Sequence, residues 1–168
     1  MDLQSELKKA LNIALLDEKA MQSVAADKNL TRFAVGIMLV SALIGAAGNV
    51  LFPRFTGFIL YRPDWGTALA SALGSFVIFI ALVYLSAFFA QKFFESKVHG
   101  EELLRVAGYG SVVGLLAILP QLGALSSLWN LVIFAVVLKR IAKLEWGAVA
   151  IIMVAVFLIA FFLRGMMY

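Results

Sequence analysis

The sequence contains no cysteine and only one histidine, His99. Disulfides, thiolate metal sites and cysteine nucleophiles are therefore excluded, and a single histidine cannot build a histidine-based metal cluster. Charged residues are also scarce, at 14% of the 168 residues, compared with about 25% in soluble domains. None occurs between Val106 and Leu138. Paired carboxylates at membrane depth and a serine–histidine pair thus have no candidates, and we expect neither an enzyme nor a cofactor.

Apolar residues are abundant instead, at 63% of the chain, and the mean hydropathy is +0.98. Soluble domains are about 45–50% apolar, so lipid must be the solvent for most of this surface. The net charge of +4 is small, and we interpret it as a topology signal rather than as affinity for nucleic acid. The composition predicts an all-α, polytopic membrane protein.

Five apolar segments are long enough to cross a hydrocarbon core, which takes roughly 20 residues. We therefore expect a five-helix bundle in residues 32–168, preceded by a cytoplasmic amphipathic segment in residues 1–31. The predicted spans are Phe33–Phe52, Gly66–Ala90, Leu103–Leu119, Leu122–Leu138 and Gly147–Leu163.

The orientation of these spans follows from the positions of lysine and arginine, which concentrate in cytoplasmic loops. Of the fourteen, only Arg54, Arg62 and Arg164 lie on one set of loops and ends. The sequence thus predicts a multi-pass protein of the cell membrane with its N-terminus in the cytoplasm and its C-terminus outside. The residues on the cytoplasmic side are Lys8, Lys9, Lys19, Lys28, Arg32, Lys92, Lys97, Arg105, Lys139, Arg140 and Lys143.

The N-terminal segment has the period of two short helices. In the first, Leu3, Leu7, Ala10, Leu11 and Ala14 share one face, whereas Glu6, Lys8, Lys9 and Asn12 fall largely off it. In the second, Asp17 is a candidate N-cap and the inward residues are Ala20, Met21, Val24 and Ala25. This segment either lies in the membrane interface or packs on the cytoplasmic face of the protein itself.

Small residues and one proline organise the membrane segments. Pro120 lacks an N–H and should break the helix between the third and fourth spans. Gly45 and Gly48 lie on one face of the first span, and Gly110 and Gly114 on one face of the third. Small residues let membrane helices approach closely, so we predict these four glycines to be packing positions.

A few polar side chains lie within the apolar segments, and an unpaired polar group is costly in hydrocarbon. They serve either as hydrogen-bonding contacts between helices or as the lining of a small polar cavity. The candidate cavity residues are Asn49, Tyr84, Tyr109, Gln121 and Asn130.

Residues 93–141 (FFESKVHGEELLRVAGYGSVVGLLAILPQLGALSSLWNLVIFAVVLKRI) resemble the core of the Yip family of Ypt/Rab-interacting membrane proteins, prokaryotic branch. The similar features are an acidic Gly-Glu-Glu, the run Leu-Leu-Arg-Val-Ala-Gly-Tyr at 103–109, Pro120, Trp129 and a basic turn before the last helix. The resemblance implies a five-helix fold with a cytoplasmic N-terminus. Eukaryotic members bind lipidated small GTPases and trafficking partners through a long N-terminal region. Here residues 1–31 precede the first span, so small-GTPase binding is not expected.

Two functions fit these features. The first is a non-enzymatic membrane scaffold that organises the bilayer or recruits partners, alone or as a homo- or hetero-oligomer with other membrane proteins. The second is a small transporter, channel or lipid-moving protein that uses the candidate polar cavity. A water-accessible cavity at those residues would distinguish the second from the first.

Overall fold

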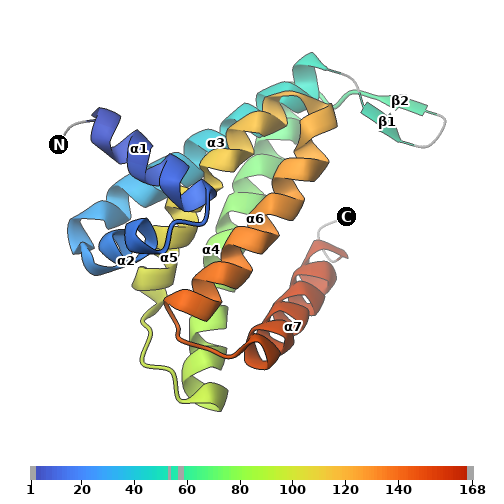
Figure 1. Ribbon diagram of the computed structural model, residues 1–168. Helices are drawn as coiled ribbons and strands as arrows, with labels where there is room; N and C mark the ends of the chain where they lie inside the picture. The colour runs from blue at the N-terminus through green and yellow to red at the C-terminus, as the bar shows by residue number, and fades with distance from the viewer. Residues whose placement is uncertain (1–2, 53, 57–58, 166–168) are drawn as a thin grey trace.

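The computed structural model describes residues 3–52, 54–56 and 59–165. These residues form a helical bundle with one short antiparallel hairpin at one end (Figure 1). The elements in chain order are α1 (Leu3–Ala14), α2 (Glu18–Ala26), the 3₁₀ helix η1 (Lys28–Leu30), α3 (Thr31–Leu51), β1 (Arg54–Thr56), β2 (Ile59–Tyr61), α4 (Trp65–Phe94), α5 (Gly100–Gly110), the 3₁₀ helix η2 (Ser111–Ile118), α6 (Pro120–Arg140) and α7 (Trp146–Gly165).

Three helical segments among the described residues are long and apolar enough to cross a membrane: Lys28–Leu51, Trp65–Phe94 and Gln121–Arg140. They agree with the first, second and fourth predicted spans to within a few residues. A shorter apolar helical segment, Trp146–Phe162, corresponds to the fifth. The prediction of a polytopic helical membrane protein is therefore confirmed.

The predicted third span is not one α-helix. Helix α5 ends at Gly110, and the following eight residues of η2 are 3₁₀-helical. Two local features favour the change: Gly108, Gly110 and Gly114 lower the α-helical propensity, and the Ser111 hydroxyl donates to the Gly108 carbonyl at 2.6 Å. Runs of 3₁₀ helix longer than three or four residues are uncommon, so η2 depends on its packing against α3 and α6.

Close backbone contacts hold η2 against α3. A Cβ added at Gly48 would lie 2.5 Å from the Ile118 carbonyl oxygen, and one added at Gly108 would lie 2.8 Å from the Ala34 Cβ. Real Cβ atoms do not approach other atoms so closely. Glycine is therefore required at both contacts between α3 and the α5–η2 segment.

The N-terminal helices pack on the protein itself, as one of the two alternatives expected. Helix α2 begins as predicted: the Asp17 carboxylate accepts from the Ala20 N–H at 3.0 Å, and Met21, Val24 and Ala25 are buried. The predicted face of α1 is partly wrong. Ala10, Ile13, Ala14 and Glu6 are buried, whereas Leu7, Leu11 and Leu15 form an exposed row. Glu6 can be buried because its carboxylate accepts hydrogen bonds from Lys9 and Tyr109.

Candidate functional site

Three sets of polar interactions hold the contact between the N-terminal helices and the membrane bundle. Its first part is a buried carboxylate, Glu6 of α1. The Tyr109 hydroxyl of α5 donates to Glu6 Oε2 at 2.5 Å, and Lys9 Nζ lies 2.8 Å from Glu6 Oε1. The Tyr109 side chain is fully buried, with the Phe33 ring 5.8 Å from its own. Helix α1 is thus attached to α5 through a charge-assisted hydrogen bond.

The charge state of Glu6 follows from its neighbours. Burial alone raises the pKa of a carboxyl, but the hydrogen bonds from Lys9 and Tyr109 and the positive charge of Lys9 more than offset that effect. The pKa of Glu6 is therefore lowered from 4.5. Glu6 is ionised at neutral pH and acts as an acceptor only.

The second part of the contact is Arg105, a buried guanidinium on α5. Its Nε donates to the Ala25 carbonyl at 3.1 Å, its Nη2 donates to the same oxygen, and its Nη1 donates to Thr31 Oγ1 at 3.3 Å. Glu101, one turn earlier on the same helix, lies 3.7 Å from Arg105 Nη1. The last carbonyls of a helix have no intrahelical partner and carry partial negative charge. Arg105 therefore caps the C-terminus of α2.

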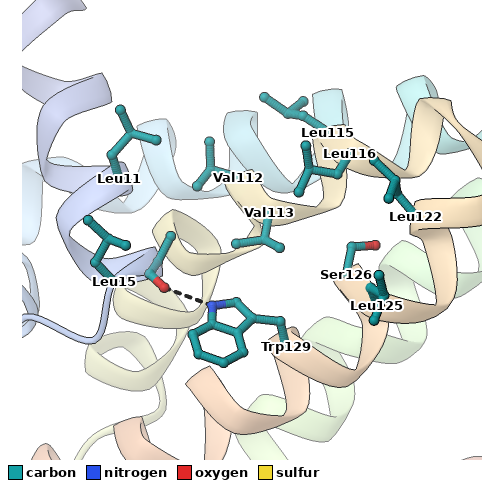
Figure 2. A pocket seen from close by; sticks show the side chains of 11 residues that line it. Leu11, Leu15, Val112, Val113, Leu115, Leu116, Leu122, Leu125, Ser126 and Trp129 are labelled. Atoms are coloured by element: carbon teal, nitrogen blue, oxygen red, sulfur yellow. Dashed lines mark hydrogen bonds between the residues drawn. The ribbon is translucent and has the colours of Figure 1, made fainter.

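The third part is Trp129 of α6, which caps the C-terminus of α1 in the same way. At the end of α1, the Asp17 N–H bonds to the Asn12 carbonyl and the Leu16 N–H to the Ile13 carbonyl, each at 2.9 Å. This pattern is a Schellman motif, with Leu16 at a positive φ of 65°. The Trp129 indole N–H then donates to the Ala14 carbonyl at 2.8 Å (dashed line in Figure 2). A C-terminal carbonyl of each N-terminal helix thus accepts a hydrogen bond from a side chain of the bundle.

An apolar groove lies beside this cap, between α1, η2 and α6 (Figure 2). Its volume is about 590 Å³. The Trp129 ring forms part of one wall, and Leu11 and Leu15 project from the other. The lining residues are Leu11, Ala14, Leu15, Val112, Val113, Leu115, Leu116, Leu122, Leu125, Ser126 and Trp129.

The five residues predicted to line a polar cavity lie in different places. Tyr109 is hydrogen-bonded to Glu6, and Tyr84, which is 44% exposed, lies against Gly100. Asn49 lies near the C-terminal end of α3, and its Oδ1 is buried without a hydrogen-bond partner among the described residues. Gln121 is exposed in the first turn of α6, and Asn130 is half-buried further along that helix. None of these five residues lines the apolar groove between α1, η2 and α6.

The predicted packing glycines lie at helix contacts within the chain. Gly45 faces the Ala117 Cβ, and Gly114 faces Ser41, whose Cβ would lie 3.2 Å from an added Cβ. Gly110 faces Ile133 of α6, and Gly48 faces the backbone of η2. Pro120 is the first residue of α6, and Leu119 alone separates it from the end of η2.

Three residues of the site were not predicted from the sequence: Glu6, Arg105 and Trp129. Arg105 did carry a signal, because it directly precedes a long uncharged run and a guanidinium there needs partners. Trp129 is one of the features that carry the family resemblance, but nothing in the sequence indicated its role as a cap. Within the part of the chain that the structure describes, no three acidic or histidine side chains lie close enough together to hold a metal ion.

The fold and this contact define a helical, multi-pass membrane protein whose N-terminal helices are capped by side chains of its own bundle. A family model, the Yip1 domain, matches residues 17–167. The chain therefore belongs to the Yip1-domain family, as the resemblance of residues 93–141 predicted. Comparison with curated proteins and with solved structures gives no match.

Proposed function

We propose that this Yip-family protein is a non-enzymatic scaffold of the cell membrane that holds two amphipathic helices on the cytoplasmic face, where they organise the bilayer or recruit partners. The match of the Yip1 domain to residues 17–167 supports the proposal. The observation that carries the proposal is the double cap. Arg105 and Trp129 fix the C-terminal ends of α2 and α1 to the bundle, so the two helices form a platform with a defined orientation.

The proposed membrane arrangement has five crossings, with the N-terminus in the cytoplasm. Besides the three long helices, α7 has 20 residues, about 30 Å at the α-helical rise. Helix α5 has 11 residues and η2 has 8. At the rise per residue of the α- and 3₁₀-helix, their combined length is about 32 Å. Residues 1–31 form the cytoplasmic part and residues 32–168 the membrane part; α2 and α5 share one apolar core. Tyr168, the outside end in this proposal, lies beyond the described residues.

The exposed row on α1 supports a membrane-organising role. Leu11 and Leu15 are 57% and 78% exposed, and leucines on one side of an interfacial helix insert into a single leaflet. A wedge in one leaflet favours curvature. The scatter of Asn49, Tyr84, Tyr109, Gln121 and Asn130 gives no support to the transporter or channel alternative.

The test is reconstitution of the full chain in unilamellar vesicles at rising protein-to-lipid ratios. We expect vesicle diameters, measured by electron cryomicroscopy, to fall as the ratio rises, and Leu11→Ser with Leu15→Ser to weaken the effect. Val154→Ser with Phe157→Ser on the exposed face of α7 is the matched control. Unchanged diameters would remove the membrane-organising role, and protein-dependent release of a trapped solute would favour the transporter.

The partner-recruiting role has a separate test in native membranes. A photo-crosslinking side chain placed at Gln22, exposed on α2, should capture a discrete protein, whereas the same side chain at Ile151, exposed on α7, should not. If both positions give the same products, α2 recruits no specific partner.

A further inference from the structure

The apolar groove has a floor and two walls. Val112, Val113, Leu115 and Leu116 of η2 form the floor, Leu11 and Leu15 of α1 one wall, and α6 the other (Figure 2). Its volume of about 590 Å³ lies within the range of ligand sites, about 300–1,000 Å³. Three elements enclose the groove, whereas one helix face alone would offer only a surface.

Water is an unsuitable occupant of this groove. Buried water needs two to four polar partners, and apolar cavities stay dry. The lining has one side-chain hydroxyl, Ser126, which already donates to the Gly123 carbonyl of its own helix at 3.0 Å. The Trp129 N–H is likewise bonded to Ala14. No polar side-chain hydrogen of the lining is left for water.

Hydrocarbon is available at the open side. The α6 wall belongs to a segment long and apolar enough to cross a membrane, Gln121–Arg140. Leu125 lines the groove, and Leu128, three residues further along α6, is also exposed, so the groove borders on exposed leucines of that segment. A lipid chain can therefore enter from the bilayer without crossing a polar surface.

A positive charge stands beside the groove. Lys8 and Leu11 are spaced i, i+3 on one face of α1, and Leu15, directly after the end of this helix, follows Leu11 by four residues. Lys8 is exposed and forms no ion pair among the described residues, whereas its neighbour Lys9 is engaged by Glu6. An ammonium group one turn from an apolar wall is complementary to a lipid phosphate, and snorkelling lets its stem follow the leucines.

We propose that the groove between α1, η2 and α6 is a binding site for one acyl chain of an anionic phospholipid, whose phosphate is held by Lys8. The bound chain packs against Val113 and Trp129 and fills the space between α1 and α6. It extends the apolar contact of α1 with the bundle, so lipid and helix stabilise each other. The lipid site shares Leu11 and Leu15 with the proposed wedge, but it goes beyond the scaffold function, because its test measures occupancy of the groove and not curvature or partners.

The experiment uses the full chain in nanodiscs, with Trp65→Phe and Trp146→Phe substituted so that Trp129 is the only one left of three tryptophans. The probes are phosphatidylglycerol and phosphatidylcholine with brominated acyl chains, which quench tryptophan on contact, each at the same low mole fraction in unlabelled phosphatidylcholine. We expect brominated phosphatidylglycerol to quench Trp129 more strongly. Lys8→Gln should reduce this preference about fivefold, since one lysine near anionic lipid contributes about 1 kcal/mol.

A second variant tests the groove itself. Val113→Phe fills the floor opposite Trp129 and should remove the excess quenching, whereas Val154→Phe on the exposed face of α7 should leave it unchanged. Equal quenching by the two lipids, or an anionic preference that Lys8→Gln leaves unaltered, overturns the proposal. Because Lys8 is exposed and its replacement does not threaten folding, that result is decisive even if Val113→Phe destabilises the protein.

Discussion

The Tyr109 hydroxyl donates a hydrogen bond to the carboxylate of Glu6, a residue 103 positions earlier in the chain. Both side chains are buried, and the bond joins the first helix to α5. Tyr109→Phe removes the donor and leaves a buried carboxylate with Lys9 as its remaining side-chain partner. A hydrogen bond to a charged group contributes about 1.5–3 kcal/mol, so we expect a clearly lower melting temperature in detergent.

The control for this variant is Tyr84→Phe, because Tyr84 is 44% exposed and its ring stays beside Gly100 as phenylalanine. Its melting temperature should stay close to that of the unmodified protein. Equal effects of the two substitutions would show that the Glu6 bond does not contribute to stability.

The pH dependence follows from the lowered pKa of Glu6. A carboxyl whose pKa is lower in the folded than in the unfolded state stabilises the fold above its unfolded value, here 4.5, and that contribution is lost as the pH falls through the folded value. We expect the difference in melting temperature between the unmodified protein and Glu6→Gln to be largest near neutral pH. It should shrink below about pH 4.5. A difference that is independent of pH would contradict an ionised, stabilising Glu6.

The cap that Arg105 provides depends on the planar guanidinium, which a lysine cannot replace. Arg105→Lys should loosen α2 and increase amide hydrogen exchange within Glu18–Ala26, about tenfold for every 1.4 kcal/mol lost. Arg140→Lys is the matched control, since Arg140 also contacts α2, through Glu18 at 3.2 Å, but is half exposed. Exposed pairs contribute about 0–1 kcal/mol, so exchange in α2 should change little there.

Two glycines of α3, Gly36 and Gly48, distinguish the effect of packing on stability from the effect of helix propensity. Gly48→Ala places a methyl group 2.5 Å from the Ile118 carbonyl oxygen, whereas nothing lies within 4 Å of a Cβ at Gly36. Overpacking typically costs about 1–3 kcal/mol. Gly48→Ala should therefore lower the melting temperature, and Gly36→Ala should leave it unchanged or raise it slightly because alanine favours the helix. The reverse order would refute the close contact between α3 and η2.

The proposed topology can be read from reporters at the two ends. Eleven of the fourteen lysines and arginines lie on the loops and ends assigned to the cytoplasm, and the basic turn after α6 and the β1–β2 hairpin lie at opposite ends of the bundle (Figure 1). A reporter fused before Met1 should be active inside, and one fused after Tyr168 outside. Activity of both on the same side would rule out an odd number of crossings.

The amino-acid sequence by itself determined the membrane class and the limits of most helices. The apolar run Trp65–Phe94 is bounded by Asp64 and Glu95, and the length of such a run relative to the hydrocarbon thickness is a local property of the chain. The Asp17 cap and the start of α6 at Pro120 are local for the same reason. The family could likewise be recognised from the sequence, because its motif at residues 103–109 is contiguous.

Tertiary structure alone decided which face of α1 is buried, where α5 gives way to η2, and how the polar groups pair. The apolar moment of α1 favoured the leucines, yet Glu6 is buried and Leu11 exposed. The reason is that an isolated carboxylate is costly to bury and a paired one is not, and the partner, Tyr109, is remote in sequence. Likewise, the donors for the Ala14 and Ala25 carbonyls come from Trp129 and Arg105. Long-range pairs of this kind form only in the packed bundle, so the apolar periodicity of a single segment cannot predict them.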